Sequence, residues 1–141
     1  MAATRLIAIV GKQNAGKTTL LAALAAEFAR RRQRVMTITE DAHPAESNPL
    51  TLARRCMDSA DMIFMEGFAR ARLPKIEVYR KVCGPDPLFD ASKPEAADWV
   101  AMVTDNPTFR APFPVFRFSD TSWLVTLANL AWDRAKVLTP A

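Results

Sequence analysis

The sequence predicts an α/β domain with a doubly wound, mostly parallel sheet that carries helices on both faces. Three observations support this fold class. Short apolar runs rich in β-branched residues alternate with segments of helical period. The first two runs are separated by a crossover as long as a βαβ unit requires. The chain has 141 residues, which suits one domain that spans residues 1–141 and buries a single core.

The N-terminal third is expected to hold the first βαβ unit. Residues 6–10 form a continuous apolar run that ends at Gly11, which is typical of a strand buried on both faces. From Thr18 the period becomes helical, with apolar positions at Leu20, Leu21, Leu24 and Phe28. The expected helix ends in a cluster of cations that complement its dipole, namely Arg30, Arg31, Arg32 and Arg34. Residues 35–39 form the second strand, and a short helix is expected over 50–59.

The rest of the chain continues the alternation. Further buried strands are expected at 61–65, 76–79, 99–103 and 115–118. The Pro-rich stretch 83–94 is expected to be a loop. Ser119 or Asp120 is expected to cap a last helix with Trp123, Leu124, Leu127, Leu130 and Ala131 on its apolar face. Lys75 and Glu77 alternate with apolar residues, so we expect them to share one face that is available to a second copy of the chain.

Composition excludes several classes of protein. The net charge of +4 comes from 19 basic and 15 acidic residues, an excess too small to indicate nucleic-acid binding. Cys56 and Cys83 lie in unrelated contexts and His43 is the single histidine, so no disulfide framework, zinc site or Ser-His triad is indicated. No apolar run reaches 18 residues, so we expect no membrane segment and a cytoplasmic protein.

Residues 11–18 read Gly-Lys-Gln-Asn-Ala-Gly-Lys-Thr and match the pattern of a phosphate-binding loop (P-loop), G-x-x-x-x-G-K-[ST]. They follow a buried strand and open a helix, where glycines let successive N–H groups face phosphate oxygens. Lys17 is expected to place its charge between the β- and γ-phosphates, and the Thr18 hydroxyl to ligate magnesium. The residues expected to contact the nucleotide are Gly11, Asn14, Ala15, Gly16, Lys17, Thr18 and Thr19. The alternative is an ordinary Gly-containing turn with a surface lysine.

Glu66 is expected to complete the phosphate site. It follows the strand at 61–65, and doubly wound sheets bind their ligands at the carboxyl ends of the strands. An acidic residue at that position holds the magnesium shell and can orient the attacking water, so we expect Glu66 and Lys17 to carry any hydrolysis. Glu40 and Asp41 follow the second strand, and they either reach the magnesium side or lie in a solvated loop.

These motifs together resemble the MobB family, the molybdopterin-guanine dinucleotide biosynthesis accessory proteins. The motifs are the P-loop with its Lys-Thr-Thr-Leu-Leu continuation, Asp-Met-Ile-Phe-Met-Glu-Gly-Phe at 61–68 and Pro-Lys-Ile-Glu-Val-Tyr-Arg at 74–80. Val-Thr-Asp-Asn-Pro at 103–107 is similar to a later strand and turn of the family. The chain departs from the family pattern between Thr39 and Asp61, where 21 residues stand in place of a longer insert that typically begins with a Lys-His pair.

The resemblance implies a P-loop NTPase-type fold and a homodimer that binds GTP and Mg²⁺ and hydrolyses GTP slowly. The implied partner is a MobA-like molybdopterin guanylyltransferase, which attaches GMP to molybdopterin, or a molybdoenzyme chaperone. Asp105 ends a central strand, where many GTPases place the carboxylate that accepts from guanine N1–H and N2–H₂. A type I turn with Asp at its first position is the alternative. Arg70 and Arg72 either face the phosphates or lie in a solvated loop.

Two other functions would use the same P-loop. A small kinase that acts on a small molecule or a nucleotide needs a lid and an acceptor pocket, and the sequence has no arginine-rich lid segment. A non-hydrolysing binding module would use the nucleotide to order a dimer surface. The residues alone do not separate this module from a slow GTPase.

Overall fold

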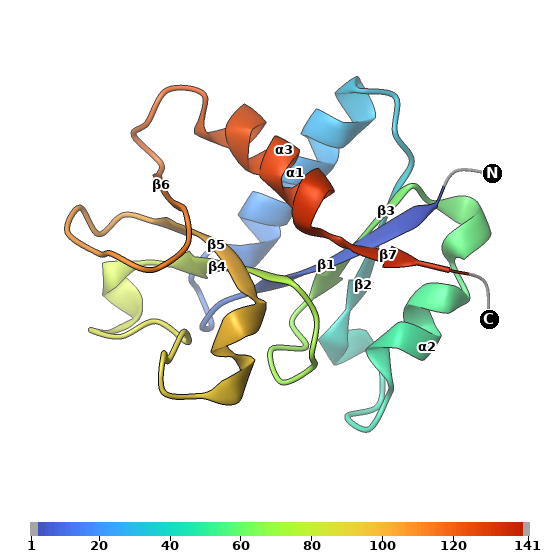
Figure 1. The fold of residues 1–141 in the computed structure, drawn as a ribbon, viewed down its shortest axis with the longest axis horizontal. Helices are drawn as coiled ribbons and strands as arrows, with labels where there is room; N and C mark the ends of the chain where they lie inside the picture. Colours follow the sequence, from blue (N-terminus) through green and yellow to red (C-terminus); the bar gives the residue numbers. More distant parts are fainter. Residues whose placement is uncertain (1–2, 140–141) are drawn as a thin grey trace.

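Six parallel strands form the sheet that organises the chain (Figure 1). The structure is a computed structural model that describes residues 3–139. In spatial order the strands are β2 (Val35–Thr39), β3 (Met62–Glu66), β1 (Thr4–Val10), β4 (Lys75–Tyr79), β5 (Trp99–Thr104) and β6 (Val115–Arg117). A seventh strand, β7 (Lys136–Leu138), pairs antiparallel with the first half of β1. The predicted mostly parallel sheet is confirmed.

Strand β1 lies at the centre of the sheet because its residues are apolar toward both faces. Residues 6–9 have no exposed surface, and the strand pairs with β3 on one side and β4 on the other. Ile7 and Ile9 pack into the cluster on one face, while Leu6 and Ala8 pack into the cluster on the other. The continuous apolar run at 6–10 thus has the cause that the sequence suggested, which is burial on both faces.

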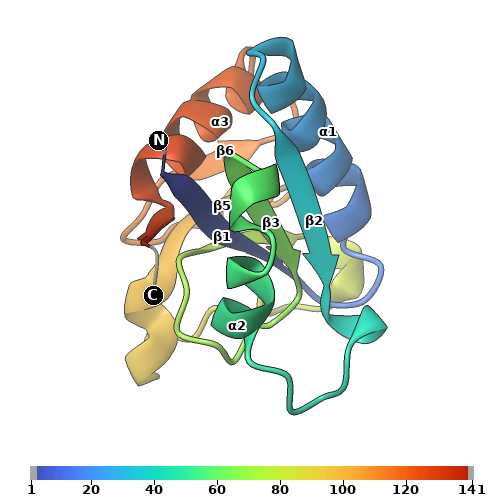
Figure 2. The ribbon, with the colours of Figure 1, turned by 90° about the vertical axis from the view of Figure 1, so that its right-hand side faces the viewer.

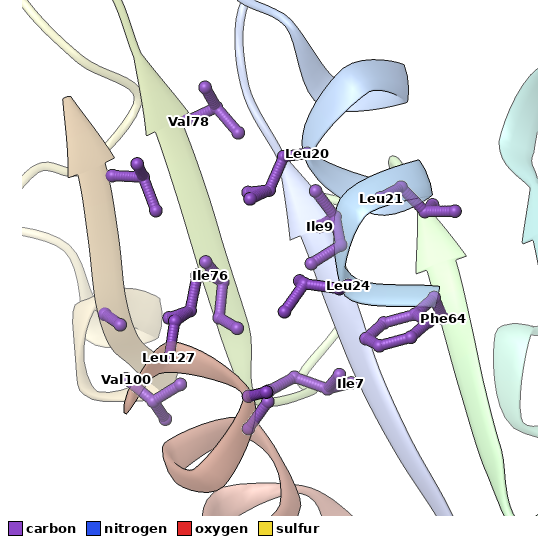
Figure 3. Close-up of a cluster of buried hydrophobic side chains, with 14 of the residues drawn as sticks. Ile7, Ile9, Leu20, Leu21, Leu24, Phe64, Ile76, Val78, Val100 and Leu127 are labelled. Carbon is purple, nitrogen blue, oxygen red and sulfur yellow. The ribbon is translucent and has the colours of Figure 1, made fainter. Parts of the chain in front are cut away.

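Two helices cover one face of the sheet. Helices α1 (Lys17–Arg30) and α3 (Trp123–Arg134) pack against each other and against alternate residues of the strands (Figure 3). The buried side chains include Ile9, Leu20, Leu24, Phe64, Ile76, Val78 and Leu127. A fully buried side chain of this kind stabilises the fold by about 1.5–3 kcal/mol, so this layer holds the start of α1 firmly over the sheet. Within residues 3–139, no helix combines the length and apolarity needed to cross a membrane.

The opposite face carries shorter segments. Helix α2 (Pro49–Arg54) packs there through Ala53 and lies apart from α1 and α3, near the β2 edge (Figure 2). Asn48 caps α2, because its Oδ1 accepts hydrogen bonds from the backbone N–H groups of Leu50 (2.9 Å) and Thr51 (3.4 Å). The predicted helices on both faces are therefore confirmed.

Helix α2 is shorter than the sequence predicts. The expected helix over 50–59 ends at Arg54, and a 3₁₀ turn (Met57–Ser59) follows. The Thr4 hydroxyl of β1 lies 2.8 Å from the carbonyl oxygen of Met57 and 2.7 Å from that of Ala60. These contacts hold the turn against β1, so tertiary hydrogen bonds replace further helical ones.

The C-terminal region corrects two expectations. Neither Ser119 nor Asp120 caps α3, which begins at Trp123 after Ser122. The Asp120 carboxylate instead accepts a hydrogen bond from the backbone N–H of Arg117 (2.9 Å) and closes the turn after β6. The sequence prediction also lacks β7, whose three residues are too few to show a period of their own.

Lys75 and Glu77 share one face as expected, but that face is buried and is not available to a second copy. The Glu77 side chain is fully buried. Its carboxylate accepts hydrogen bonds from the backbone N–H groups of Leu88 (2.6 Å) and Phe89 (2.9 Å) and from Trp99 Nε1 (3.0 Å). Burial raises the pKa of Glu77, and these hydrogen bonds oppose that rise. Glu77 thereby fixes the Pro-rich loop over the sheet.

The buried ammonium group of Lys75 is likewise paired, with carbonyl oxygens and a carboxylate. Its ammonium group donates hydrogen bonds to the carbonyl oxygens of Ala71 and Leu73 (3.1 Å to Leu73) and lies 3.6 Å from the Asp98 carboxylate. Burial lowers the pKa of Lys75, and the nearby Asp98 carboxylate opposes that effect. A buried charge requires such partners, because an unpaired one is costly.

Glu27 links helices α1 and α3 through Arg31. It lies in α1 with 7% of its surface exposed, and its carboxylate binds Arg30 (2.7 Å) and Arg31 (2.7 Å). Arg31 also donates a hydrogen bond to Asn129 Oδ1 of α3 (2.8 Å). The hydrogen bonds from Arg30 and Arg31 lower the pKa of Glu27 from 4.5 to about 2.

The lowered pKa of Glu27 predicts how stability depends on pH. A carboxyl group whose pKa is lowered by folding stabilises the folded state above its unfolded value of about 4.5. That contribution is lost as the pH falls from about 4.5 toward 2. We expect the melting temperature of the wild-type chain to fall more steeply over this range than that of Glu27→Gln. If the melting temperatures of the two proteins fall in parallel from pH 6 to pH 2, the role of Glu27 is contradicted.

Candidate phosphate-binding site

The P-loop lies at the carboxyl edge of the parallel sheet, between the end of β1 and the start of α1. The turn is closed by a hydrogen bond from the backbone N–H of Ala15 to the carbonyl oxygen of Lys12 (3.1 Å). Gly16 has a φ of 100°, which a side chain would disfavour, and Asn14 has a φ of 67°. Alternating left-handed positions bend the chain so that its N–H groups can converge on an anion.

The two lysines of the P-loop point to different places. Lys17 Nζ donates a hydrogen bond to the carbonyl oxygen of Gly11 (3.1 Å), so its ammonium group lies across the mouth of the loop. Lys12 Nζ instead donates to the carbonyl oxygen of Asp86 (2.5 Å), in the loop that follows β4. Only Lys17 is therefore positioned over the loop. Thr18 and Thr19 follow in the first turn of α1, and both are exposed.

Glu66 meets the P-loop through Thr18. Its Oε1 accepts a hydrogen bond from Thr18 Oγ1 (2.9 Å), and its Oε2 accepts one from Thr39 Oγ1 (3.4 Å). The register explains this arrangement, because Thr39 of β2, Glu66 of β3 and Ile9 of β1 lie side by side across the three strands. Thr39 is a site residue that sequence reasoning missed, although it ends a strand at this edge of the sheet.

Hydroxyl and carboxylate oxygens so close together suit magnesium, which prefers oxygen ligands and keeps several positions for phosphate and water. Thr18 and Glu66 are the residues that would hold it. Among residues 3–139, no group of three or more His, Cys, Asp and Glu side chains is placed to bind a metal ion. A magnesium ion at Thr18 and Glu66 would therefore depend on phosphate oxygens as well.

A cavity of about 750 Å³ lies beyond the ends of β2 and β3. Its charged, polar and aromatic lining includes Glu40, Asp41, His43, Ser47, Phe68 and Arg70. Glu40 lies across Gly67, where an added Cβ would come within 2.9 Å of Glu40 Oε1, and the φ of 98° at Gly67 also disfavours a side chain. Glu40 thus lies beside the residue that follows Glu66, and Glu40, Asp41 and Arg70 are all exposed.

Arg72 lies at the other end of the sheet. Its Nε donates to the Asp98 carboxylate (2.6 Å), just before β5 begins. The P-loop lies where parallel strands end, so Arg72 does not face the phosphates. The solvated alternative therefore fits Arg72 better, with Asp98 as its partner.

Asp105 follows β5 and is exposed, two strands away from β1. Its Oδ1 accepts a hydrogen bond from the backbone N–H of Lys81 (2.9 Å), which ties the loop after β4 to the end of β5. The side chain thus has one oxygen bound within the protein. Asn106 Oδ1 accepts from the backbone N–H of Thr108 (3.0 Å), so this segment also forms a tight turn.

Arg80, which sequence reasoning left without a role, contacts the P-loop directly. It follows β4, and its Nε donates a hydrogen bond to the carbonyl oxygen of Ala15 (3.0 Å). Its guanidinium carbon lies 4.6 Å from the centre of the Phe118 ring. The available signal was the alternation in β4, which places Arg80 on the same face as Ile76 and Val78.

The sequence model of the MobB family, molybdopterin guanine dinucleotide synthesis protein B, matches residues 6–51 and 46–105 of the chain. This covers well over half of the sequence, including the P-loop, Glu66 and Asp105. The chain belongs to the MobB family. The two matched stretches overlap at residues 46–51, between β2 and β3.

Solved MobB structures share the fold. A MobB homologue from Bacillus stearothermophilus aligns over 89% of this chain and 97% of its own, with a TM-score of 0.62 and 22% identity. Bacillus subtilis MobB aligns over 94% and 98%, with a TM-score of 0.61 and 15% identity. No curated protein matches the sequence significantly. The MobB structures have a P-loop NTPase fold, so the predicted fold class is confirmed, and membership supports nucleotide binding in molybdenum cofactor biosynthesis.

The positions of the two P-loop lysines predict the effect of removing each. Lys17→Ala removes the charge over the loop, so we expect nucleotide affinity to fall below detection in a titration. Lys12→Ala makes the same change in charge within the same loop, but Lys12 is bonded to Asp86. We expect its affinity to stay within a few-fold of wild type. Equal loss in both variants would show that the net charge of the loop, rather than Lys17, binds the phosphates.

Proposed function

We propose that the chain is a GTP-binding accessory protein of molybdopterin guanine dinucleotide biosynthesis that hydrolyses GTP slowly with Mg²⁺. The observation that carries this proposal is the hydrogen bond between Thr18 and Glu66 at 2.9 Å, at the mouth of a P-loop. A hydroxyl and a carboxylate at this place are the two protein oxygens that a nucleotide-bound magnesium ion needs. The membership of the MobB family supplies the biosynthetic setting.

Each residue has a distinct task in this proposal. Backbone N–H groups of the P-loop and the first turn of α1 receive the β-phosphate, and Lys17 compensates charge between the β- and γ-phosphates. Thr18 and Glu66 hold the magnesium shell, and Glu66 orients the attacking water. The magnesium ion, when bound, neutralises charge that develops on the phosphate oxygens. Slow turnover fits a site whose nearby cavity holds Arg70, an exposed arginine for which no contact with the P-loop is seen among residues 3–139.

Asp105 is proposed to select guanine. The γ-phosphate lies toward Glu66 of β3, so the order β3-β1-β4-β5 directs the base toward the end of β5. Asp105 stands at that end, with one carboxylate oxygen bonded to Lys81 and the other turned to no partner among residues 3–139. A carboxylate can accept from guanine N1–H and N2–H₂ and would repel the acceptor edge of adenine.

The proposal includes a homodimer in the cytoplasm and a MobA-like molybdopterin guanylyltransferase or a molybdoenzyme chaperone as partner. In the described part of the chain, β2 and β6 are the outer strands of the sheet, so each leaves backbone groups along one side for a second chain. The segment from Glu40 to Pro49 lines the cavity beside Glu66. Partner contacts through this segment would therefore lie next to the phosphates.

Glu66→Gln tests the magnesium role. The amide keeps an oxygen for Thr18 but lacks the negative charge that the metal shell requires. We therefore expect GTP binding to survive and the single-turnover rate of hydrolysis to fall by at least about tenfold. Glu46→Gln, at an exposed position on the loop before α2, is the matched control and should hydrolyse GTP as wild type does. An unchanged rate in Glu66→Gln would remove Glu66 from the reaction.

Asp105→Asn tests base selection cleanly, because the asparagine oxygen can still accept from Lys81 N–H. The change leaves a donor facing a guanine donor, which costs about 1–3 kcal/mol, or roughly 5- to 150-fold in affinity. We expect weaker GTP binding, unchanged ATP binding and partial recovery with XTP, which carries an oxygen in place of the guanine amine. Competition titrations with the three nucleotides measure this. If all three weaken alike, Asp105 supports only the turn.

A further inference from the structure

Arg80 binds the peptide group between Ala15 and Gly16 in the P-loop. Its Nε donates to the carbonyl oxygen of Ala15 at 3.0 Å, and Ala15 itself is buried. The guanidinium group lies against the bare Cα of Gly16, where an added Cβ would come within 3.4 Å of Arg80 Nε and 3.6 Å of Nη2. Arg80 therefore contacts the carbonyl side of the Ala15–Gly16 peptide, not the mouth of the loop occupied by Lys17.

The geometry of a trans peptide makes this contact matter for phosphate binding. The C=O of Ala15 and the N–H of Gly16 belong to one planar group and point in opposite directions. A cation that fixes the carbonyl oxygen on one side fixes the N–H on the other. It also polarises the peptide, because a hydrogen bond to a charged group is stronger than a neutral one.

Arg80 is itself held in place. Its guanidinium group stacks on Phe118 at 4.6 Å, and Phe118 in turn makes an edge-to-face contact with Trp123 of α3, at 5.5 Å between ring centres. Alternation along β4 turns Arg80 to the α1 side of the sheet, like Val78. Three elements, β4, the end of β6 and α3, thus converge on one peptide of the loop.

We propose that Arg80 is a positioning residue for phosphate binding, which aims the Gly16 N–H at the β-phosphate by holding the Ala15 carbonyl from behind. The inference rests on the proposed nucleotide binding at the P-loop. In this role Arg80 does not contact the base. Replacing Arg80 should therefore lower the affinity for every ligand that fills the β-phosphate position by the same factor.

The test compares Arg80→Met and Arg80→Lys with wild type, using Mg²⁺-pyrophosphate, GDP, GTP and ATP as probes. Methionine keeps an apolar stem on Phe118 but donates no hydrogen bond. We expect all four affinities to fall by a common factor of about 10 to 100, because a hydrogen bond that involves a charged group is lost. Lysine can still donate to Ala15, so we expect it to recover most of the affinity. Arg54→Met, an exposed arginine of α2 on the opposite face, is the control and should bind as wild type does.

The Gly16 amide resonance separates positioning from a loss of fold stability. In wild type we expect pyrophosphate to move the Gly16 amide proton downfield, as a hydrogen bond to an anion does. In Arg80→Met this shift should shrink, while the remaining amide spectrum and the melting temperature stay near those of wild type. Wild-type affinity for pyrophosphate in Arg80→Met, or an undiminished Gly16 shift, would overturn the inference. A wild-type chain that binds neither pyrophosphate nor nucleotide would overturn the proposed function instead.

Discussion

The register between β1 and β3 is the constraint on which the whole carboxyl edge depends. Glu66 lies beside Ile9, two residues before the P-loop begins, and Thr39 lies beside Glu66 on the far side. Paired residues of parallel strands point to the same face, so Ile9 packing under α1 turns Glu66 toward Thr18. A slip of one residue would bury Glu66 on the opposite face and leave Thr18 without its carboxylate. The apolar residues at 6–10 therefore set the position of the site through their register and packing.

The same edge is also held by residues of β4 and of the segment that directly follows it. Glu77, buried on the face opposite α1, fixes the loop after β4, and that loop binds Lys12 through Asp86. Arg80, on the α1 face of the same strand, holds the Ala15 carbonyl. One strand thus braces the P-loop from both faces. The buried carboxylate of Glu77 is tolerated because hydrogen bonds from Leu88, Phe89 and Trp99 compensate it.

The sequence predicts the features that depend on local pattern. The strands at 6–10 and 35–39 lie where expected, because continuous apolar runs record burial on both faces, and the P-loop follows from a motif whose glycines and lysine have fixed tasks. Features set by distant segments escape it. Alternation shows that Lys75 and Glu77 share a face, but the loop that buries this face comes later in the chain. The early end of α2 depends on Thr4, and the role of Arg80 depends on Phe118, which no local period reveals.

In the proposed complex the nucleotide lies across the carboxyl edge, with its γ-phosphate at Glu66 and its base at the end of β5. A crystal structure with Mg²⁺ and a non-hydrolysable GTP analogue measures this directly. We expect the metal beside Thr18 and Glu66, the γ-phosphate within reach of Lys17, and guanine against Asp105. A base that lies instead in the cavity beyond β2 and β3, against Phe68 and Arg70, would contradict the account.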